Sequence, residues 1–113
     1  MALNVIDDNI NLTRGDSADL IVTIRDAGGN VYEMQSGDIL TFTVKVNCNT
    51  DDITIQKVRT NNIVTLLPSD TENLAYGSYW YDVQLTTSGD DIYTVIPPHR
   101  FNITPEVTFN EGD

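Results

Sequence analysis

The residue types that most often do chemistry in proteins are scarce in this chain. His99 is its only histidine and Cys48 its only cysteine. A serine or cysteine hydrolase needs a base beside its nucleophile, and neither Cys48 nor any serine stands in a recognisable nucleophile motif. One histidine and one cysteine are also too few ligands for a zinc site. The sequence therefore predicts a protein that is not an enzyme and holds no cofactor, with His99 as an exposed residue of an edge strand.

Carboxylates are abundant by contrast. Seventeen acidic residues stand against six basic ones, which gives a net charge of -11 at pH 7. The pairs Asp7-Asp8, Asp51-Asp52 and Asp90-Asp91 fall in expected loops or at the terminus, and sandwich loops rich in carboxylates can bind Ca²⁺. No segment has the spacing of a calcium-binding hand motif, and aspartate is also an ordinary turn residue. Calcium is therefore a secondary expectation.

The acidic balance also limits the partners. Binding to nucleic acid depends on lysine and arginine side chains that neutralise phosphates, and an anionic membrane surface attracts the same side chains. No run approaches the roughly 20 apolar residues of a transmembrane helix. The segment 1–8 has neither a basic stretch nor an apolar run, so no signal peptide is predicted. We expect no nucleic-acid or membrane partner, and synthesis in a reducing cytoplasm.

One surface is a candidate binding face. The segments 39–46 and 79–86 alternate apolar and polar residues with a period of two, as half-buried strands do. If these strands pair, their polar sides share one exposed face, and a tryptophan on it is notable because tryptophan is enriched at binding hot spots. The candidate partner-binding residues are Thr43, Lys45, Trp80, Asp82 and Gln84. Two alternatives stay open: Tyr32 or the C-terminal segment packs over Trp80, or Lys45 and Asp82 merely pair across the strands.

Short alternating runs separated by Gly, Asn, Asp and Ser clusters fill the chain between these segments and on both sides of them. We predict strands at 9–13, 19–25, 39–46, 53–59, 63–67, 79–86, 92–96 and 99–104, with a short hairpin return at 31–34. Pro97-Pro98 lacks two backbone donors, which confines it to a sheet edge or a bulge. About seven to nine strands with turn signals roughly every 8–12 residues is typical of a β-sandwich.

The segment before the 79–86 strand makes the fold class more specific. Residues 68–74 give a helical-turn start signal without room for a longer helix, and Gly77 then precedes a strand that opens on Tyr79. This order is similar to the corner before strand F of an immunoglobulin-type sandwich. We predict one all-β domain over 1–113, an immunoglobulin-like antiparallel β-sandwich, with flexible ends at 1–8 and 110–113. Its expected core is Leu20, Val22, Ile24, Leu40, Phe42, Val44, Tyr79, Tyr81, Val83 and Leu85.

The tripeptide Arg14-Gly15-Asp16 matches one that many integrin ligands display. Here it falls between the first two predicted strands, where glycine and aspartate are ordinary turn residues. We therefore predict a turn at this position and no integrin-binding site.

The order and spacing of these segments resemble a family of small immunoglobulin-like proteins of tailed phages and prophages of Gram-positive bacteria. The chain is similar to the N-terminal domain of phage baseplate upper proteins. The likeness rests on the segments 13–17, 23–30, 40–45, 74–85, 93–96 and 100–104. Those proteins continue into helices and a receptor-facing or adaptor domain, whereas this chain stops at Asp113, so we expect a stand-alone module.

The resemblance implies attachment within a virion and no catalysis. The expected function is therefore that of a phage or prophage structural or accessory protein of the tail, baseplate or capsid, made in the bacterial cytoplasm without a signal peptide. It would contact other virion proteins, or copies of itself in a ring or array, through the Trp80 face and the edge strand near Pro97. The alternative is a carbohydrate- or cell-surface-binding module, with calcium as a possible aid.

Overall fold

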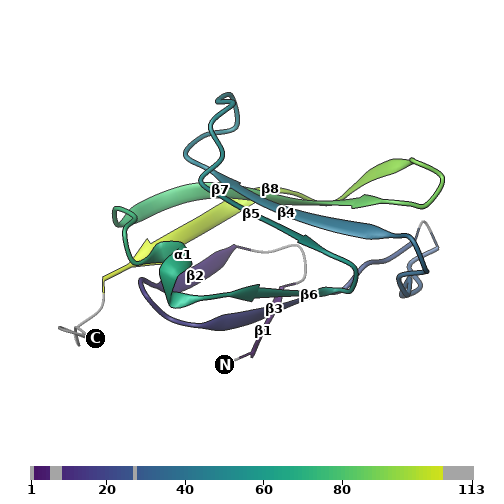
Figure 1. Cartoon of the computed structure of the whole chain (residues 1–113), viewed down its shortest axis with the longest axis horizontal. Helices are drawn as coiled ribbons and strands as arrows, with labels where there is room; N and C mark the ends of the chain where they lie inside the picture. Colours follow the sequence, from purple (N-terminus) through teal and green to yellow (C-terminus); the bar gives the residue numbers. More distant parts are fainter. Residues whose placement is uncertain (1, 6–8, 27, 106–113) are drawn as a thin grey trace.

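Strands dominate the chain and are arranged in two layers (Figure 1). The computed structural model describes residues 2–5, 9–26 and 28–105, with side chains described from residue 9 onward. The elements are β1 (Ala2–Val5), β2 (Ile10–Thr13), β3 (Ala18–Val22), β4 (Ile39–Lys45), β5 (Ile55–Arg59), β6 (Ile63–Leu66), α1 (Pro68–Thr71), β7 (Gly77–Thr86) and β8 (Ile92–Thr104). The prediction of an all-β chain is confirmed.

The larger layer is a five-stranded sheet with the order β2-β8-β7-β4-β5, and the smaller layer has the order β1-β3-β6. In the larger sheet, β7 lies at the centre between β8 and β4 and is antiparallel to both. The small sheet packs under the larger one, with β3 in its middle (Figure 1). The predicted hairpin return at 31–34 is reduced to one bridge between Arg25 and Val31.

The expectation of purely antiparallel sheets is wrong at two places. β1 pairs with β3 in parallel, and β2 pairs with β8 in parallel. Alternation along a strand shows which residues face the core but carries no information on the neighbouring strand or its direction, so the sequence pattern could not reveal these pairings. β1 also lies in a segment where no strand was expected, while residues 6–8 and 110–113 lie outside the described residues.

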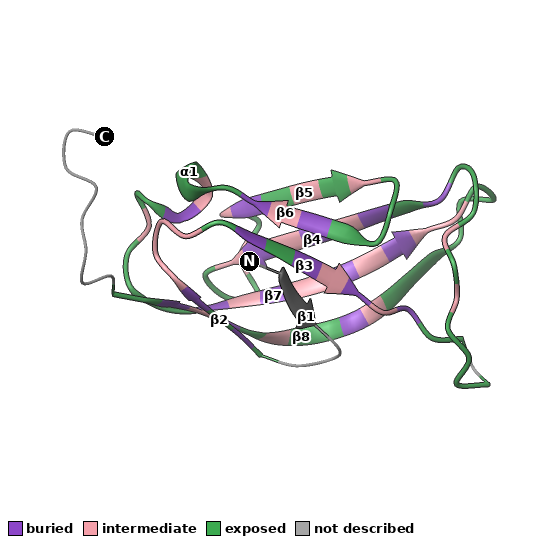
Figure 2. Cartoon of the chain, turned by 90° about the horizontal axis from the view of Figure 1, so that it is seen from below, coloured by how far each residue is buried: buried purple, intermediate pink, exposed green. Residues whose placement is uncertain are grey.

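The space between the layers is filled by the predicted core. All ten residues expected there are buried, and β2, β6 and β8 add further apolar side chains to them. The largest fully buried side chains of the core are aromatic: the ring centroid of Phe42 lies 5.6 Å from that of Tyr81 and 6.1 Å from that of Phe101. Buried and exposed residues alternate along the strands, as a half-buried sheet requires (Figure 2).

The corner before β7 is held by side chains from several elements. The predicted helical turn is α1, a single turn of four residues that begins at Pro68. Asp70 accepts a hydrogen bond from the Leu67 backbone N–H at 2.7 Å and forms an ion pair with Lys57 at 2.9 Å. The Tyr79 hydroxyl donates back to the Ala75 carbonyl at 2.8 Å. These contacts fix the point at which β7 starts, and with it the register of the central strand.

Pro97-Pro98 produces the predicted irregularity without ending the strand. β8 continues through both prolines, and the pairing shifts between Tyr81, which lies opposite His99, and Val83, which lies opposite Ile96. Between these two pairs one residue of β7, Asp82, is matched by two of β8, Pro97 and Pro98, which is a bulge. The pairing shifts again between Val83 and Gln84. β2 pairs with β8 only from Phe101 to Thr104. The earlier part of β8, residues 92–100, therefore has no strand on its outer side among the described residues.

Candidate functional site

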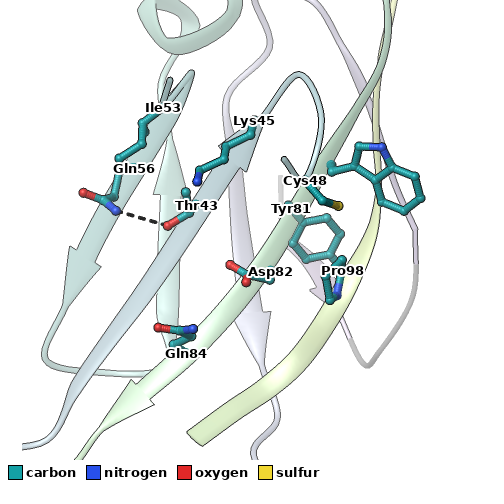
Figure 3. Close-up of a pocket in the computed structure, with 10 residues that line it drawn as sticks. Thr43, Lys45, Cys48, Ile53, Gln56, Tyr81, Asp82, Gln84 and Pro98 are labelled. Carbon is teal, nitrogen blue, oxygen red and sulfur yellow. Dashed lines mark hydrogen bonds between the residues drawn. The ribbon is translucent and has the colours of Figure 1, made fainter. Parts of the chain in front are cut away.

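The structure brings the five predicted site residues together on the outer face of the five-stranded sheet. Lys45 lies opposite Trp80, and Thr43 lies opposite Asp82, with Gln84 one pair further along β7. All five line an open groove of about 280 Å³ (Figure 3). Its other lining residues are Cys48, Ile53, Gln56, Tyr81 and Pro98. That this face binds a partner stays a prediction, but its residues do form one site.

Trp80 is half-buried, and the side chain stacked on it is Arg100 and not Tyr32, while the C-terminal segment beyond residue 105 lies outside the described residues. The guanidinium carbon of Arg100 lies 4.0 Å from the centre of the indole. Arg100 pairs with Trp80 across β7 and β8. Tyr32 instead donates a hydrogen bond of 2.5 Å to Asp38. Arg100 was missed in the sequence because its position opposite Trp80 depends on the bulge at the prolines, which cannot be counted from the pattern alone.

Lys45 and Asp82 do not form the direct cross-strand pair that was considered. They lie on a diagonal, and the Lys45 ammonium donates to the Thr50 carbonyl at 3.0 Å. Partial burial raises the pKa of the Asp82 carboxyl, and the positive charge of Lys45 opposes this only in part. Within the described part of the chain, no hydrogen bond to the Asp82 carboxylate is formed.

The rest of the groove is polar at its floor and apolar at its wall. On the floor, the Gln56 amide donates to the Thr43 hydroxyl at 3.2 Å, so both side chains are held across β4 and β5 (Figure 3). The wall comes from the β4–β5 loop, 46–54, which stands out from the sheet (Figure 1) and contributes Cys48 and Ile53. The groove thus combines an aromatic ring, an apolar wall and several hydrogen-bonding groups.

His99 lies beside this region but is half-buried, where an exposed position was expected. Its Nδ1 is 2.6 Å from the Pro97 carbonyl oxygen, and its ring centre is 6.3 Å from that of Tyr81. The bulge at the prolines turns the imidazole toward the Tyr81 ring of β7, which explains why His99 is less exposed than expected.

Metal ligands do not gather in the described part of the chain. No three His, Cys, Asp or Glu side chains there are placed to hold an ion. Asp7 and Asp8, which belong to the calcium expectation, lie outside the described residues. The calcium-assisted alternative thus has no site among the carboxylates whose positions are known.

The Arg14-Gly15-Asp16 segment is a turn, as predicted. The Asp16 backbone N–H donates to the Thr13 carbonyl at 3.1 Å, and Gly15 has a φ of +82°. Gly15 also donates to the buried Thr71 hydroxyl at 2.8 Å. The Arg14 guanidinium lies 4.2 Å from the centre of the Tyr76 ring. The tripeptide therefore ties the β2–β3 turn to the corner before β7.

Comparison with known proteins adds no further constraint on the site: no family model matches the chain, and no curated protein is similar to it in sequence. No helix in the described part is long and apolar enough to cross a membrane.

Proposed function

We propose that this chain is a non-enzymatic structural or accessory protein of a phage or prophage particle. It would serve as a tail, baseplate or capsid-associated module and act through protein–protein contacts. The resemblance of segments 13–17, 23–30, 40–45 and 74–85 to phage immunoglobulin-like proteins supports this class of function. The contact regions are the Trp80 face and the outer edge of β8.

Two features support an immunoglobulin-like arrangement of the strands. The Tyr79 hydroxyl reaches back four residues to the Ala75 carbonyl, which is the geometry of the tyrosine corner in such sandwiches. In addition, β7 is flanked by β8 and β4 in the larger sheet, while β3 and β6 pair in the smaller one. In an immunoglobulin domain strands F, G and C and strands B and E have the same relations.

The observation that carries the proposal is the exposed hairpin of β7 and β8. Ile92 and Tyr93 are 63% and 55% exposed, and no described strand covers β8 beside them. An uncovered strand edge with large apolar side chains readily pairs with another chain, and monomeric proteins normally protect such edges. A particle protein that is buried between neighbours has no need of that protection.

Mass spectrometry of phage particles, purified after prophage induction in the strain that carries the gene, tests the proposal. We expect the chain at a fixed ratio to the capsid or tail proteins. Ile92→Lys should lower that ratio severalfold, because it places a charge in the contact. Ile63→Lys is the matched control, since Ile63 is a 40% exposed strand residue of the small sheet. Absence from clean particles, with the protein present in the cells, would overturn the proposal.

A further inference from the structure

The floor of the groove contains polar groups that the protein itself leaves without partners. Asp82 and Gln84 point into it from β7 (Figure 3), and neither side chain has a hydrogen bond within the described residues. Asp82 is also partly withdrawn from water. A ligand that donates a hydrogen bond to this partly desolvated carboxylate supplies a charge-assisted contact that the protein itself does not make. The groove is therefore prepared for a hydrogen-bonding ligand.

The charges around the groove select against an ionic ligand. An anion would meet the Asp82 carboxylate in a chain whose net charge is -11. A cation would be attracted by the net charge but would meet the Lys45 ammonium within the groove. A neutral ligand avoids both repulsions, and a hydroxyl group can donate to Asp82 while it accepts from the Gln84 amide.

Trp80 supplies the apolar surface that a sugar ring requires. Arg100 stacks on the indole at 4.0 Å and is not among the residues that line the groove, whereas Trp80 is. The guanidinium thereby holds the indole in one orientation. Ile53 and Pro98 extend the apolar surface on the two flanks of the groove. A flat ligand with hydroxyls at its rim and C–H groups on its faces matches this combination.

We propose that the groove binds a neutral saccharide, with Trp80 against the sugar ring and Asp82 and Gln84 hydrogen-bonded to its hydroxyls. This binding gives the Trp80 face, one of the two contact regions of the proposed structural role, a further activity. It requires no metal ion, and it leaves the outer edge of β8 available for contacts within a particle. A volume of about 280 Å³ accommodates one or two sugar units at a time.

Trp80 is the only tryptophan of the chain, so its fluorescence reports on the groove alone. We would titrate the protein with neutral trisaccharides of glucose, mannose, galactose, rhamnose and N-acetylglucosamine, with sialylated and glucuronic-acid trisaccharides beside them. At least one neutral sugar should shift the emission with a Kd in the millimolar range or tighter, unchanged by salt or by a chelator. Asp82→Ala should weaken that binding about tenfold, because a hydrogen bond to a charged group is lost.

Asp19→Ala is the matched control, because Asp19 lies on the small sheet and accepts a hydrogen bond from Thr65 at 2.9 Å. It should leave sugar binding unchanged, and Asp82→Asn, which keeps an acceptor oxygen, should bind better than Asp82→Ala. The inference is overturned if no neutral sugar binds, if only acidic sugars bind, or if Asp82→Ala binds as well as the wild type. The structural function is scored separately by the particle incorporation of Ile92→Lys, which lies outside the groove, so failure of sugar binding and failure of the structural proposal are distinguishable.

Discussion

The inner and outer faces of β7 are built from alternate residues of one strand, yet they differ in exposure, polarity and hydrogen bonding. The inner residues are at most 8% exposed: Tyr79, Tyr81, Val83 and Leu85. The outer residues Trp80, Asp82 and Gln84 are half-buried and line the groove. The inner face fills the space against the small sheet, whereas the outer face has no second sheet over it in the described chain (Figure 1).

This difference separates residues that hold the fold from residues that are available for binding. On the inner face, the one described polar contact of Tyr79 is satisfied by the Ala75 carbonyl. On the outer face, the Asp82 carboxylate is partly desolvated and has no donor within the described residues. The fold therefore does not use this carboxylate as a hydrogen-bond acceptor, which leaves it available in the open groove.

The largest expected loss of stability comes from a substitution in the core against which the inner face of β7 packs. Phe42→Ala removes the ring that packs against both Tyr81 and Phe101 and should lower the free energy of unfolding by about 3–5 kcal/mol. Urea denaturation followed by circular dichroism measures the loss. Trp80→Ala is the comparison on the outer face and should cost about 1 kcal/mol, since it removes a partly exposed ring and its contact with Arg100. Equal losses would contradict the division of roles between the two faces.

The alternation of β7 and β4 could be predicted from sequence because a period of two fixes which side chains share a face, and β4–β7 pairing then assembles the groove floor. The contact between Arg100 and Trp80 could not be predicted from the sequence, because it depends on a bulge whose size is set by packing around Pro97-Pro98. The parallel partners of β1 and β2 are likewise decided by the path of the chain between layers, which leaves no periodic signal.

A second, smaller effect concerns the hydroxyl of Tyr79, the first inner-face residue of β7 that is buried. Tyr79→Phe keeps the ring and removes the hydroxyl that donates to Ala75 at 2.8 Å. The loss should be about 1–2 kcal/mol, because the carbonyl of the corner is left without this donor. Thermal unfolding measures it, with Tyr93→Phe as the control, since Tyr93 is 55% exposed. A neutral Tyr79→Phe would mean that the corner is held by α1 alone.

A third test addresses the hydrogen bond between the half-buried Tyr32 and the buried Asp38. The hydrogen bond from Tyr32 lowers the pKa of Asp38, with further help from the backbone N–H of Gln35, and the same bond raises the pKa of Tyr32. A lowered carboxyl pKa stabilises the fold above the ordinary value of 3.8, and this stability is lost as the pH falls below it. A raised phenol pKa stabilises the fold below the ordinary value of 10.0, and this stability is lost as the pH rises above it.

Tyr32→Phe should therefore destabilise the protein at neutral pH and flatten its stability profile at both the acidic and the alkaline end. Urea denaturation at a series of pH values gives that profile. Phenylalanine preserves the ring, so a profile with the wild-type slopes at both ends would show that the pair does not contribute to the pH dependence.

The smallest expected effect is a gain in stability, and it comes from a substitution of Asp82 on the outer face of β7. Burial raises the pKa of Asp82, so its charged form is disfavoured in the fold, and this group lowers stability as the pH rises above the ordinary carboxyl value of 3.8. Asp82→Asn removes the charge while it keeps the shape, and it should raise stability slightly at pH 7 and leave stability unchanged at pH 3. Chemical denaturation at the two pH values measures this. Asp19→Asn, which removes a carboxylate bonded to Thr65, is the control and should not stabilise. A loss of stability in Asp82→Asn at pH 7 would instead show that the carboxylate supports the fold, and the groove would then offer no unmet group to a ligand.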